Sequence, residues 1–277
     1  MSVDIEDWFQ VGAFETVISR ADWDNLEHRV ERNSNVVLDL FEEAGIKATF
    51  FTLGWVAERY PALMQRIASA GHEVASHGYD HARIYTLTPD QFRDDLNRSR
   101  KILEDSSGQA VTGYRAPSFS IDQRTPWAHE ILAEQGYRYS SSVAPIRHDH
   151  YGWNGSPRFA WKPVAGSDLI ELPVTTVRVG KRILAAGGGG FFRLLPYGLY
   201  DRAIRKMQKE DGRSAIFYFH PWEIDPGQPR VGNAPIKSKL RHYSRLSAMH
   251  SKLVRVGKDH IWGRMDELAA SEAGRIQ

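Results

Sequence analysis

Apolar and polar positions along the chain alternate between two kinds of segment. Short apolar runs bounded by turn residues predict strands at residues 1–5, 48–53, 73–76, 113–115, 137–141, 169–173 and 214–219. Longer stretches with amphipathic character predict helices at residues 24–44, 55–70, 88–104, 125–135, 197–209 and 239–256. This alternation is typical of repeated β/α units, so an α/β fold is expected.

Local signals mark several helix ends. Thr88 and Gln91 form a capping-box pattern at the start of the third helix. Gly45, Gly71 and Gly136 each stand between a helix and a strand, where a left-handed glycine cap is common.

One domain with a C-terminal helical extension is expected. The boundary is placed between residues 1–222 and 223–277, and the stretch 221–241, rich in Pro and Gly, is expected to wrap around the first part. The four glycines at 187–190 predict a mobile loop rather than a phosphate-binding loop, because no Lys-Ser/Thr pair follows them.

Composition removes several classes of protein and site. The 277 residues are 42% hydrophobic and 25% charged, as in ordinary globular proteins, and the net charge of +2 does not indicate nucleic-acid binding. No apolar run approaches the roughly 20 residues of a membrane span. The chain has no cysteine, so any metal must be held by His and carboxylate side chains.

The first residues do not have the composition of a secretion signal. Acidic side chains appear almost at once, which predicts a cytoplasmic location for the chain as written. An extracytoplasmic location is expected instead if a leader has been removed. The sequence leaves the oligomeric state open.

Two segments at predicted strand ends carry candidate metal ligands. Asp4, Glu6 and Asp7 put three carboxylates within four positions, which repel one another unless a cation or an arginine compensates. His77 and His81 lie four positions apart on a turn, so both imidazoles can converge on one ion. Alone, each segment also has a plain explanation, as a solvated loop start or an incidental histidine pair.

A third segment adds His220 at the end of an apolar strand, between Tyr218 and Trp222. A core histidine among packed aromatics is the plain explanation. Taken together, however, one carboxylate and two histidines leave coordination positions open for water and substrate, as in catalytic metal sites. A spare carboxylate can then act as general base and a separate histidine as general acid.

These segments resemble, in order, the motifs of carbohydrate esterase family four, the polysaccharide deacetylases. The resemblance covers roughly residues 1–222. It is carried by Ser2-Val3-Asp4-Ile5-Glu6-Asp7, His77-Gly78-Tyr79-Asp80-His81, Arg115-Ala116-Pro117-Ser118 and Tyr218-Phe219-His220.

Further runs resemble one branch of that family, the deacetylases found with exosortase-type exopolysaccharide systems. These runs are Tyr139-Ser140-Ser141-Ser142, residues 146–152, residues 220–226 and Leu240-Arg241-His242-Tyr243. The resemblance therefore reaches nearly the whole chain.

The resemblance implies a distorted (β/α)₇ barrel and metal-assisted hydrolysis of N-acetyl groups on amino sugars. A divalent metal, with Zn²⁺ expected, would be held by His77, His81 and a carboxylate. Glu6 and Asp7 compete for that position, and Glu6 is favoured because the subgroup's ligand lies two residues after the base.

The same resemblance assigns the remaining roles. Asp4 would be the base, kept ionised by Arg115, and His220 the general acid. The backbone N–H of Ser118 would bind the oxyanion. Residues expected to contact the acetylated polysaccharide or oligosaccharide are Pro117, Tyr151, Tyr218 and Trp222.

The sequence departs from the family pattern in places. Ser140 stands where an aspartate often buttresses the arginine, and Asp149 or Asp122 could replace it. Ser118 stands in place of a tyrosine, and Gly78 in place of Ser or Thr.

Three other functions share part of this residue pattern. A metal-free amidohydrolase acting on a small cyclic amide would lose the metal histidines. A carbohydrate-binding pseudoenzyme would lose Asp4 or His220. An Fe(II) oxygenase could use two histidines and a carboxylate, but it leaves the Arg115 and His220 segments unexplained.

Overall fold

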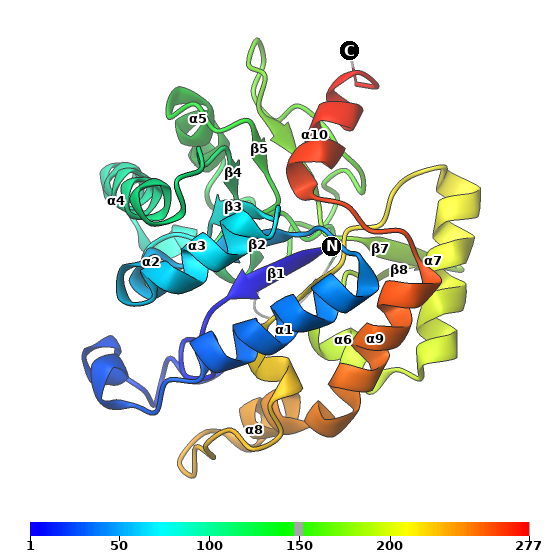
Figure 1. Cartoon of the computed structure of the whole chain (residues 1–277). Coiled ribbons are helices and arrows are strands. Elements are labelled where there is room, and N and C mark those ends of the chain that lie inside the picture. Colours follow the sequence, from blue (N-terminus) through cyan, green and yellow to red (C-terminus); the bar gives the residue numbers. More distant parts are fainter. Residues whose placement is uncertain (147–151, 277) are drawn as a thin grey trace.

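A computed structural model describes residues 1–146 and 152–276 of the chain. Its centre is a curled sheet of seven parallel strands in the order β6-β5-β4-β3-β2-β1-β9, surrounded by helices (Figure 1). The strands are β1 (Ser2–Ile5), β2 (Thr49–Thr52), β3 (Glu73–Ser76), β4 (Gly113–Tyr114), β5 (Tyr139–Ser140), β6 (Ile170–Glu171) and β9 (Tyr218–Phe219). The predicted (β/α)₇ barrel is confirmed.

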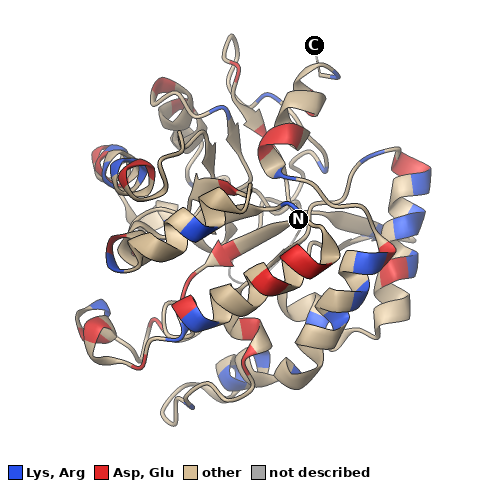
Figure 2. Cartoon of the chain, in the orientation of Figure 1, with Lys and Arg blue, Asp and Glu red and all other residues tan. Residues whose placement is uncertain are grey.

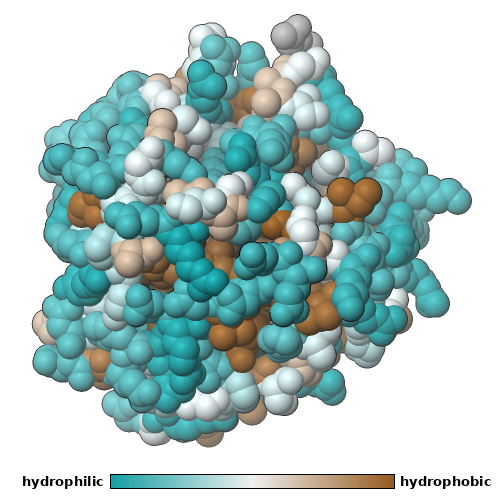
Figure 3. Space-filling view, in the orientation of Figure 1, coloured by the Kyte–Doolittle hydropathy of each residue, from teal (hydrophilic) through white to brown (hydrophobic). Residues whose placement is uncertain are grey.

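The helices are α1 (Val30–Ala44), α2 (Gly54–Arg59), α3 (Pro61–Ser69), α4 (Pro89–Ser107), α5 (Trp127–Glu134), α6 (Gly189–Leu194), α7 (Tyr197–Asp211), α8 (Ile236–Tyr243), α9 (Met249–Asp259) and α10 (Met265–Ala273). No helix among the described residues is long and apolar enough to cross a bilayer. The face seen in Figure 3 is mostly hydrophilic, with apolar side chains scattered over it.

Strand register explains which side chains enter the barrel. Asp4 pairs with Phe51, and Phe51 pairs with Ala75, so these three side chains share the inner face of the sheet. Val3 and Ile5 point the other way, into the large core beneath the outer helices. The period of two therefore turns the side chain of Asp4 into the barrel. Because Asp4 is next to the last residue of β1, it lies near the carboxyl end of the interior.

The amino end of the barrel is closed by α10, a helix that the sequence pattern did not predict. The backbone N–H of Met265 donates to Thr49 Oγ1 at 2.7 Å, and that of Asp266 donates to Glu73 Oε2 at 3.2 Å. Met265 also packs on the apolar interior around Phe51. Helix α9 contacts α1 on the outside of the barrel.

The sheet stays open between β6 and β9, where the chain takes a course that was not predicted. The antiparallel hairpin β7 (Thr176–Val179) and β8 (Arg182–Ala185) leaves the barrel here. Tyr218 N then donates to Gly187 O at 2.7 Å, and Gly188 forms a parallel bridge with Tyr218.

The prediction of a mobile loop at the four glycines was therefore wrong. Gly188 has φ 126°, and a Cβ there would lie 2.0 Å from the Tyr218 carbonyl oxygen. Glycine is required because two backbones approach closely, and Gly189 begins helix α6 immediately afterwards.

Other local predictions have mixed outcomes. The capping box of Thr88 and Gln91 is confirmed, and Gly45, Gly71 and Gly136 all have positive φ. The helix predicted over 55–70 breaks before Pro61, since a proline cannot donate an intrahelical hydrogen bond. The helix predicted over 239–256 is two helices, α8 and α9.

Candidate active site

The predicted chemical side chains converge in one cleft at the carboxyl ends of the strands. The cleft has a volume of about 490 Å³. Its walls include Asp4, Glu6, His77, His81, Ser118, Tyr218, His220 and Trp222. Barrel enzymes keep their catalytic groups at this end, because the loops that follow different strands meet there.

Glu6, His77 and His81 form a buried group whose ligand atoms all lie within 4.8 Å of one another. Burial lowers the pKa of His77 to about 4, so its imidazole is neutral at pH 7. Its Nδ1 lies 2.7 Å from the carbonyl oxygen of Arg115, which can only accept. Nδ1 must therefore carry the proton, and Nε2 keeps a lone pair for a metal.

The carboxylate of Glu6 fits the same interpretation. Its Oε2 is buried without a hydrogen-bond donor and lies 2.9 Å from His81 Nε2. Two such atoms at this distance need a proton or a cation between them. Burial opposes ionisation of Glu6, but the imidazoles of His81 and His220 outweigh it and lower its pKa to about 2. Two imidazoles and one carboxylate suit Zn²⁺ or a similar divalent ion.

Asp7 lies outside this group, although it competed with Glu6 in the sequence. Its carboxylate accepts the backbone N–H groups of Trp8 at 2.8 Å, Arg29 at 2.6 Å and Val30 at 2.9 Å. These donors include the start of α1, so Asp7 caps that helix from a distant segment. Burial raises the pKa of Asp7 to about 6.

Asp4 forms a buried ion pair with Arg115. Arg115 Nη1 lies 2.6 Å from Asp4 Oδ1 and 2.9 Å from Ser2 Oγ. Ser141 accepts the remaining donors through its carbonyl oxygen at 3.2 Å and its hydroxyl at 3.1 Å. The guanidinium also lies over the Phe51 ring, 4.1 Å from its centroid.

The serine contacts show what stands in for the aspartate that often buttresses the arginine in the family pattern. Asp122, one predicted substitute, holds Arg124 with both carboxylate oxygens, so that prediction was wrong. Asp149 lies outside the described residues. Ser2 and Ser141 supply neutral acceptors instead, and Asp4 is the carboxylate that balances the charge of Arg115.

His220 lies beside Glu6 and Asp4 in the same cleft. Its Nε2 lies 3.5 Å from Glu6 Oε1 and 3.9 Å from Asp4 Oδ2. Its Nδ1 contacts Glu223 Oε1 at 2.8 Å, and Glu223 Oε2 lies 2.7 Å from Arg193 Nε. Burial opposes protonation of His220, but Glu6 and Glu223 outweigh it and raise its pKa to about 9.

Glu223 and Arg193 were missed by the sequence analysis. Glu223 follows His220 by three residues on a 3₁₀ turn, Pro221–Ile224, that begins directly after β9. The His-x-x-Glu spacing was the available signal. Arg193 comes from α6, inside the segment that had been predicted as a loop.

The predicted substrate contacts occupy different places. Tyr218 and Ser118 line the cleft, and Ser118 has φ 56°. Trp222 lines it too, but its ring also stacks on His220 at a centroid distance of 5.1 Å and its Nε1 donates to Glu6 Oε1 at 3.2 Å. Pro117 is buried in the turn Pro117–Phe119, away from the cleft lining. Tyr151 lies outside the described residues.

The glycine within the histidine motif also has a structural reason. Gly78 has φ 75°, and a Cβ at this position would lie 2.9 Å from Asp95 Oδ2. Asp95 in turn accepts the backbone N–H of Tyr79 at 3.0 Å. The turn that brings His81 back toward His77 therefore leaves no room for a side chain.

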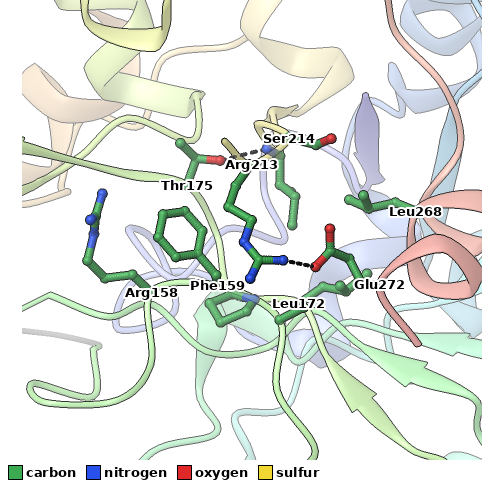
Figure 4. A pocket seen from close by; sticks show the side chains of 11 residues that line it. Arg158, Phe159, Leu172, Thr175, Arg213, Ser214, Leu268 and Glu272 are labelled. Atoms are coloured by element: carbon green, nitrogen blue, oxygen red, sulfur yellow. Dashed lines mark hydrogen bonds and ion pairs between the residues drawn. The ribbon is translucent and has the colours of Figure 1, made fainter. Parts of the chain in front are cut away.

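A second pocket lies at the open edge of the sheet and offers no comparable chemistry (Figure 4). Leu172 follows β6, Ser214 precedes β9, and Leu268 comes from α10. Its volume is about 20 Å³, room for about one water molecule. Figure 4 shows Arg213 and Glu272, two of its three charged residues, paired with each other; Arg213 Nη1 and Glu272 Oε2 are 2.8 Å apart.

Two family models match consecutive parts of the chain. Residues 23–140 match the family model described as polysaccharide deacetylase. This segment is therefore similar to the polysaccharide deacetylases. Residues 141–270 match a different model, described as a domain of unknown function (DUF3473). His77, His81 and Arg115 lie in the deacetylase segment, whereas His220 and Glu223 lie in the second.

Curated relatives match a little over a third of the chain. A peptidoglycan deacetylase of Helicobacter pylori is 36% identical over 107 residues, 39% of this chain and 36% of the relative. A peptidoglycan-N-acetylglucosamine deacetylase of Bacillus cereus is 34% identical over 95 residues, 34% of each chain. The match thus spans about a third of each relative's length.

A solved structure extends the likeness to the whole fold. A Mycobacterium smegmatis protein assigned provisionally to the polysaccharide deacetylases superposes with a TM-score of 0.65 at 22% identity. The superposition covers 100% of this chain and 90% of that one. The barrel and the segment beyond the deacetylase match therefore share one known architecture.

Proposed function

We propose that this protein is a metal-dependent hydrolase that removes N-acetyl groups from amino-sugar residues of a polysaccharide, in the synthesis or modification of an exopolysaccharide. One observation carries the proposal. A buried carboxylate–arginine pair and a buried histidine–carboxylate pair face the same group of metal-type ligands in one cleft.

The ligand set supports a divalent cation, and Zn²⁺ is the metal that we expect. Glu6, His77 and His81 would hold it through one atom each, leaving positions open for water and substrate. Bound there, the ion would acidify a water molecule and polarise the acetyl carbonyl.

Asp4 would take the proton of the attacking water. One of its oxygens is held by Arg115, which fixes the carboxylate and keeps a positive charge beside it. The other oxygen, Oδ2, is turned toward His220 Nε2, 3.9 Å away, so it faces the space between the two catalytic walls. The backbone N–H of Ser118 would bind the oxyanion that forms at the acetyl carbonyl.

His220 would protonate the departing sugar nitrogen, because an amide nitrogen leaves poorly without a proton. Its Nε2 faces the cleft, while Glu223 holds Nδ1 on the far side of the ring. This contact fixes the ring orientation and stabilises the protonated form before the transfer.

The other candidate functions fit the cleft less well. A metal-free amidohydrolase does not need the three clustered ligands, and a pseudoenzyme does not need both Asp4 and His220. An Fe(II) oxygenase could use Glu6, His77 and His81, but the buried Asp4–Arg115 pair would have no role in it.

Acetate release provides the test. The purified protein, stripped with a chelator and reloaded with Zn²⁺, would be assayed on N-acetylated chitooligosaccharides, peptidoglycan fragments and acetylated exopolysaccharides. We expect metal-dependent release from at least one of them, and release about 10²–10⁴-fold slower from the Asp4→Asn variant. Release that is equal with and without metal would contradict the proposal, as would the absence of release from every N-acetylated substrate.

A further inference from the structure

The segment that follows the active-site turn is strongly basic. Between residues 226 and 258 no Asp or Glu occurs, although the net charge of the whole chain is only +2. The basic residues are Arg230, Lys237, Lys239, Arg241, Arg245, Lys252, Arg255 and Lys258. They concentrate on α8 and α9, where Figure 2 shows Lys and Arg.

Helix α8 combines this charge with exposed apolar side chains. Ile236 is 74% exposed and Leu240 is 64% exposed, and their spacing of four places them on one face of the helix. Lys237 and Arg241 follow each of them by one residue and line the mouth of the catalytic cleft. Exposed apolar and basic side chains on one short helix are typical of helices that bind lipid interfaces.

Helix α6 adds a second apolar element beside the first. Phe191 is 42% exposed and Leu194 is 51% exposed. Together with Arg241, they line an apolar lobe of about 280 Å³. Tyr218 and His220 border both this lobe and the catalytic cleft, so the lobe opens directly onto the active site.

The two helices are fixed relative to each other by hydrogen bonds. Arg193 on α6 donates to the carbonyl oxygens of His242 at 2.6 Å and Arg241 at 2.8 Å. Lys252 on α9 donates to the carbonyl oxygens of Phe192 at 2.9 Å and Leu195 at 2.7 Å, at the end of α6. The exposed apolar residues therefore stand on a rigid support.

We propose that this rim, formed by α6 and α8, docks on a membrane surface that contains anionic lipids. Ile236, Leu240 and the apolar side chains of α6 would enter the headgroup region, and the basic residues would contact lipid phosphates. Glu15, an acidic residue that also lines the cleft, is paired with Arg83 at 3.0 Å.

Docking would turn the catalytic cleft toward saccharides held at the membrane. This consequence rests on the proposed deacetylase function, whereas the docking itself does not. It also gives the segment 141–270 a role beyond the supply of His220, because that segment contributes α6 and α8.

Vesicle sedimentation tests the docking. The full chain would be mixed with phosphatidylcholine vesicles, with or without phosphatidylglycerol. We expect binding to the anionic vesicles, weakened by salt because the charged contribution is screened. The double variant Ile236→Ser/Leu240→Ser should lose roughly tenfold or more of this binding, since both apolar contacts are removed together. The pair Lys239→Gln/Arg245→Gln should weaken binding to the vesicles that contain phosphatidylglycerol. Any binding to pure phosphatidylcholine vesicles should stay unchanged.

Matched controls lie at the other end of the barrel. Ile261 is fully exposed, at 103%, and stands close to Gly263, whose carbonyl oxygen accepts the amino group of Met1. Ile261→Ser should bind vesicles like the parent protein, as should Lys47→Gln/Arg138→Gln before β2 and β5. Equal losses in rim and control variants would overturn the proposal.

Other occupants of the rim give different results. Binding to a soluble polyanion such as dextran sulfate without vesicle binding would overturn membrane docking. Concentration-dependent self-association lost in Ile236→Ser/Leu240→Ser, again without vesicle binding, would do the same. Acetate release from soluble oligosaccharides should persist in all rim variants, so vesicle binding without any such release would count against the deacetylase function alone.

Discussion

Each end of the barrel buries a glutamate, but the pKa values of the two carboxyl groups are shifted in opposite directions. At the carboxyl end, the imidazoles of His81 and His220 outweigh burial and lower the pKa of Glu6 to about 2. At the amino end, burial dominates and raises the pKa of Glu73 to about 7. Burial therefore does not by itself indicate function, because the neighbouring groups decide which form of the carboxyl is stable.

The two glutamates also differ in their hydrogen-bond partners. Glu73 is satisfied on both oxygens, by the hydroxyl of Tyr139 at 2.8 Å and by the N–H of Asp266 at 3.2 Å together with the Thr49 hydroxyl. Glu6 Oε2 instead faces His81 Nε2, 2.9 Å away, an atom that can ligate a metal once its proton is lost. A carboxyl held by fixed donors is suited to hold structure, whereas an ionised one beside imidazoles is suited to share a cation with them.

Removing a metal ligand should have the largest effect. His77→Ala deletes one of three ligands, so bound Zn²⁺ and acetate release should fall together, by more than the roughly 10–100-fold that loss of an outer-shell contact costs. Metal content after dialysis and acetate release would be measured on the same sample. His250→Ala, an exposed histidine of α9, is the control and should change neither. Full metal occupancy in His77→Ala would refute the ligand assignment.

Asp4→Asn should separate catalysis from metal binding. We expect metal to be retained while the rate falls by about 10²–10⁴-fold, the usual effect of removing an acid–base group. Stability should fall as well, because Arg115 stays buried without the carboxylate that balances it. Turnover numbers and urea unfolding curves would be compared with those of the parent protein. A near-normal rate would reduce Asp4 to a structural role.

Glu223→Gln should have a smaller and more selective effect. The neutral amide supports a protonated His220 less well, so acetamide hydrolysis should slow by roughly 10–100-fold. An activated aryl acetate should be spared, because its leaving group hardly needs a proton. His220→Ala should show the same selectivity more strongly. Equal losses on both substrates, with fold and metal intact, would argue against the general-acid role.

Much of the carboxyl end could be predicted from sequence. Residues at or just beyond the ends of β1, β3 and β9 line one cleft, because buried strands fix where each loop begins. Strand position alone left Glu6 and Asp7 competing, since both follow the same strand, and only the family resemblance favoured Glu6. It depends on α1, whose first N–H groups are contacted by Asp7 across more than 20 intervening residues.

The second half of the chain was predicted less well, for tertiary reasons. Four glycines have low helix propensity, yet α6 begins among them because Gly188 must pass close to the Tyr218 carbonyl. The hairpin β7–β8 has exposed residues on both strands and therefore no strong burial pattern. The partner of His220 was hidden for the opposite reason, since a glutamate three residues away looks like ordinary surface charge.

Glu73→Gln should have the smallest effect and should leave acetate release unchanged. Because the pKa of Glu73 rises from 4.5 to about 7 on folding, the native state binds more protons than the unfolded state within that range. Stability should therefore fall as pH rises from about 4.5 to about 7, and the variant should lose this part of the slope. Urea unfolding at about pH 5 and about pH 8 measures it, and an unchanged slope would contradict the contrast between the two ends.

The central claim is that the carboxyl end of the barrel binds a metal through Glu6, His77 and His81. Anomalous diffraction from crystals of the Zn²⁺-loaded protein, recorded at the zinc absorption edge, tests it most directly. We predict one peak at roughly 2.0–2.2 Å from one atom of each of these three residues, with Asp7 still bound to the first N–H groups of α1. A peak coordinated by Asp7 with Glu6 turned away, or no peak in this cleft, would contradict the account.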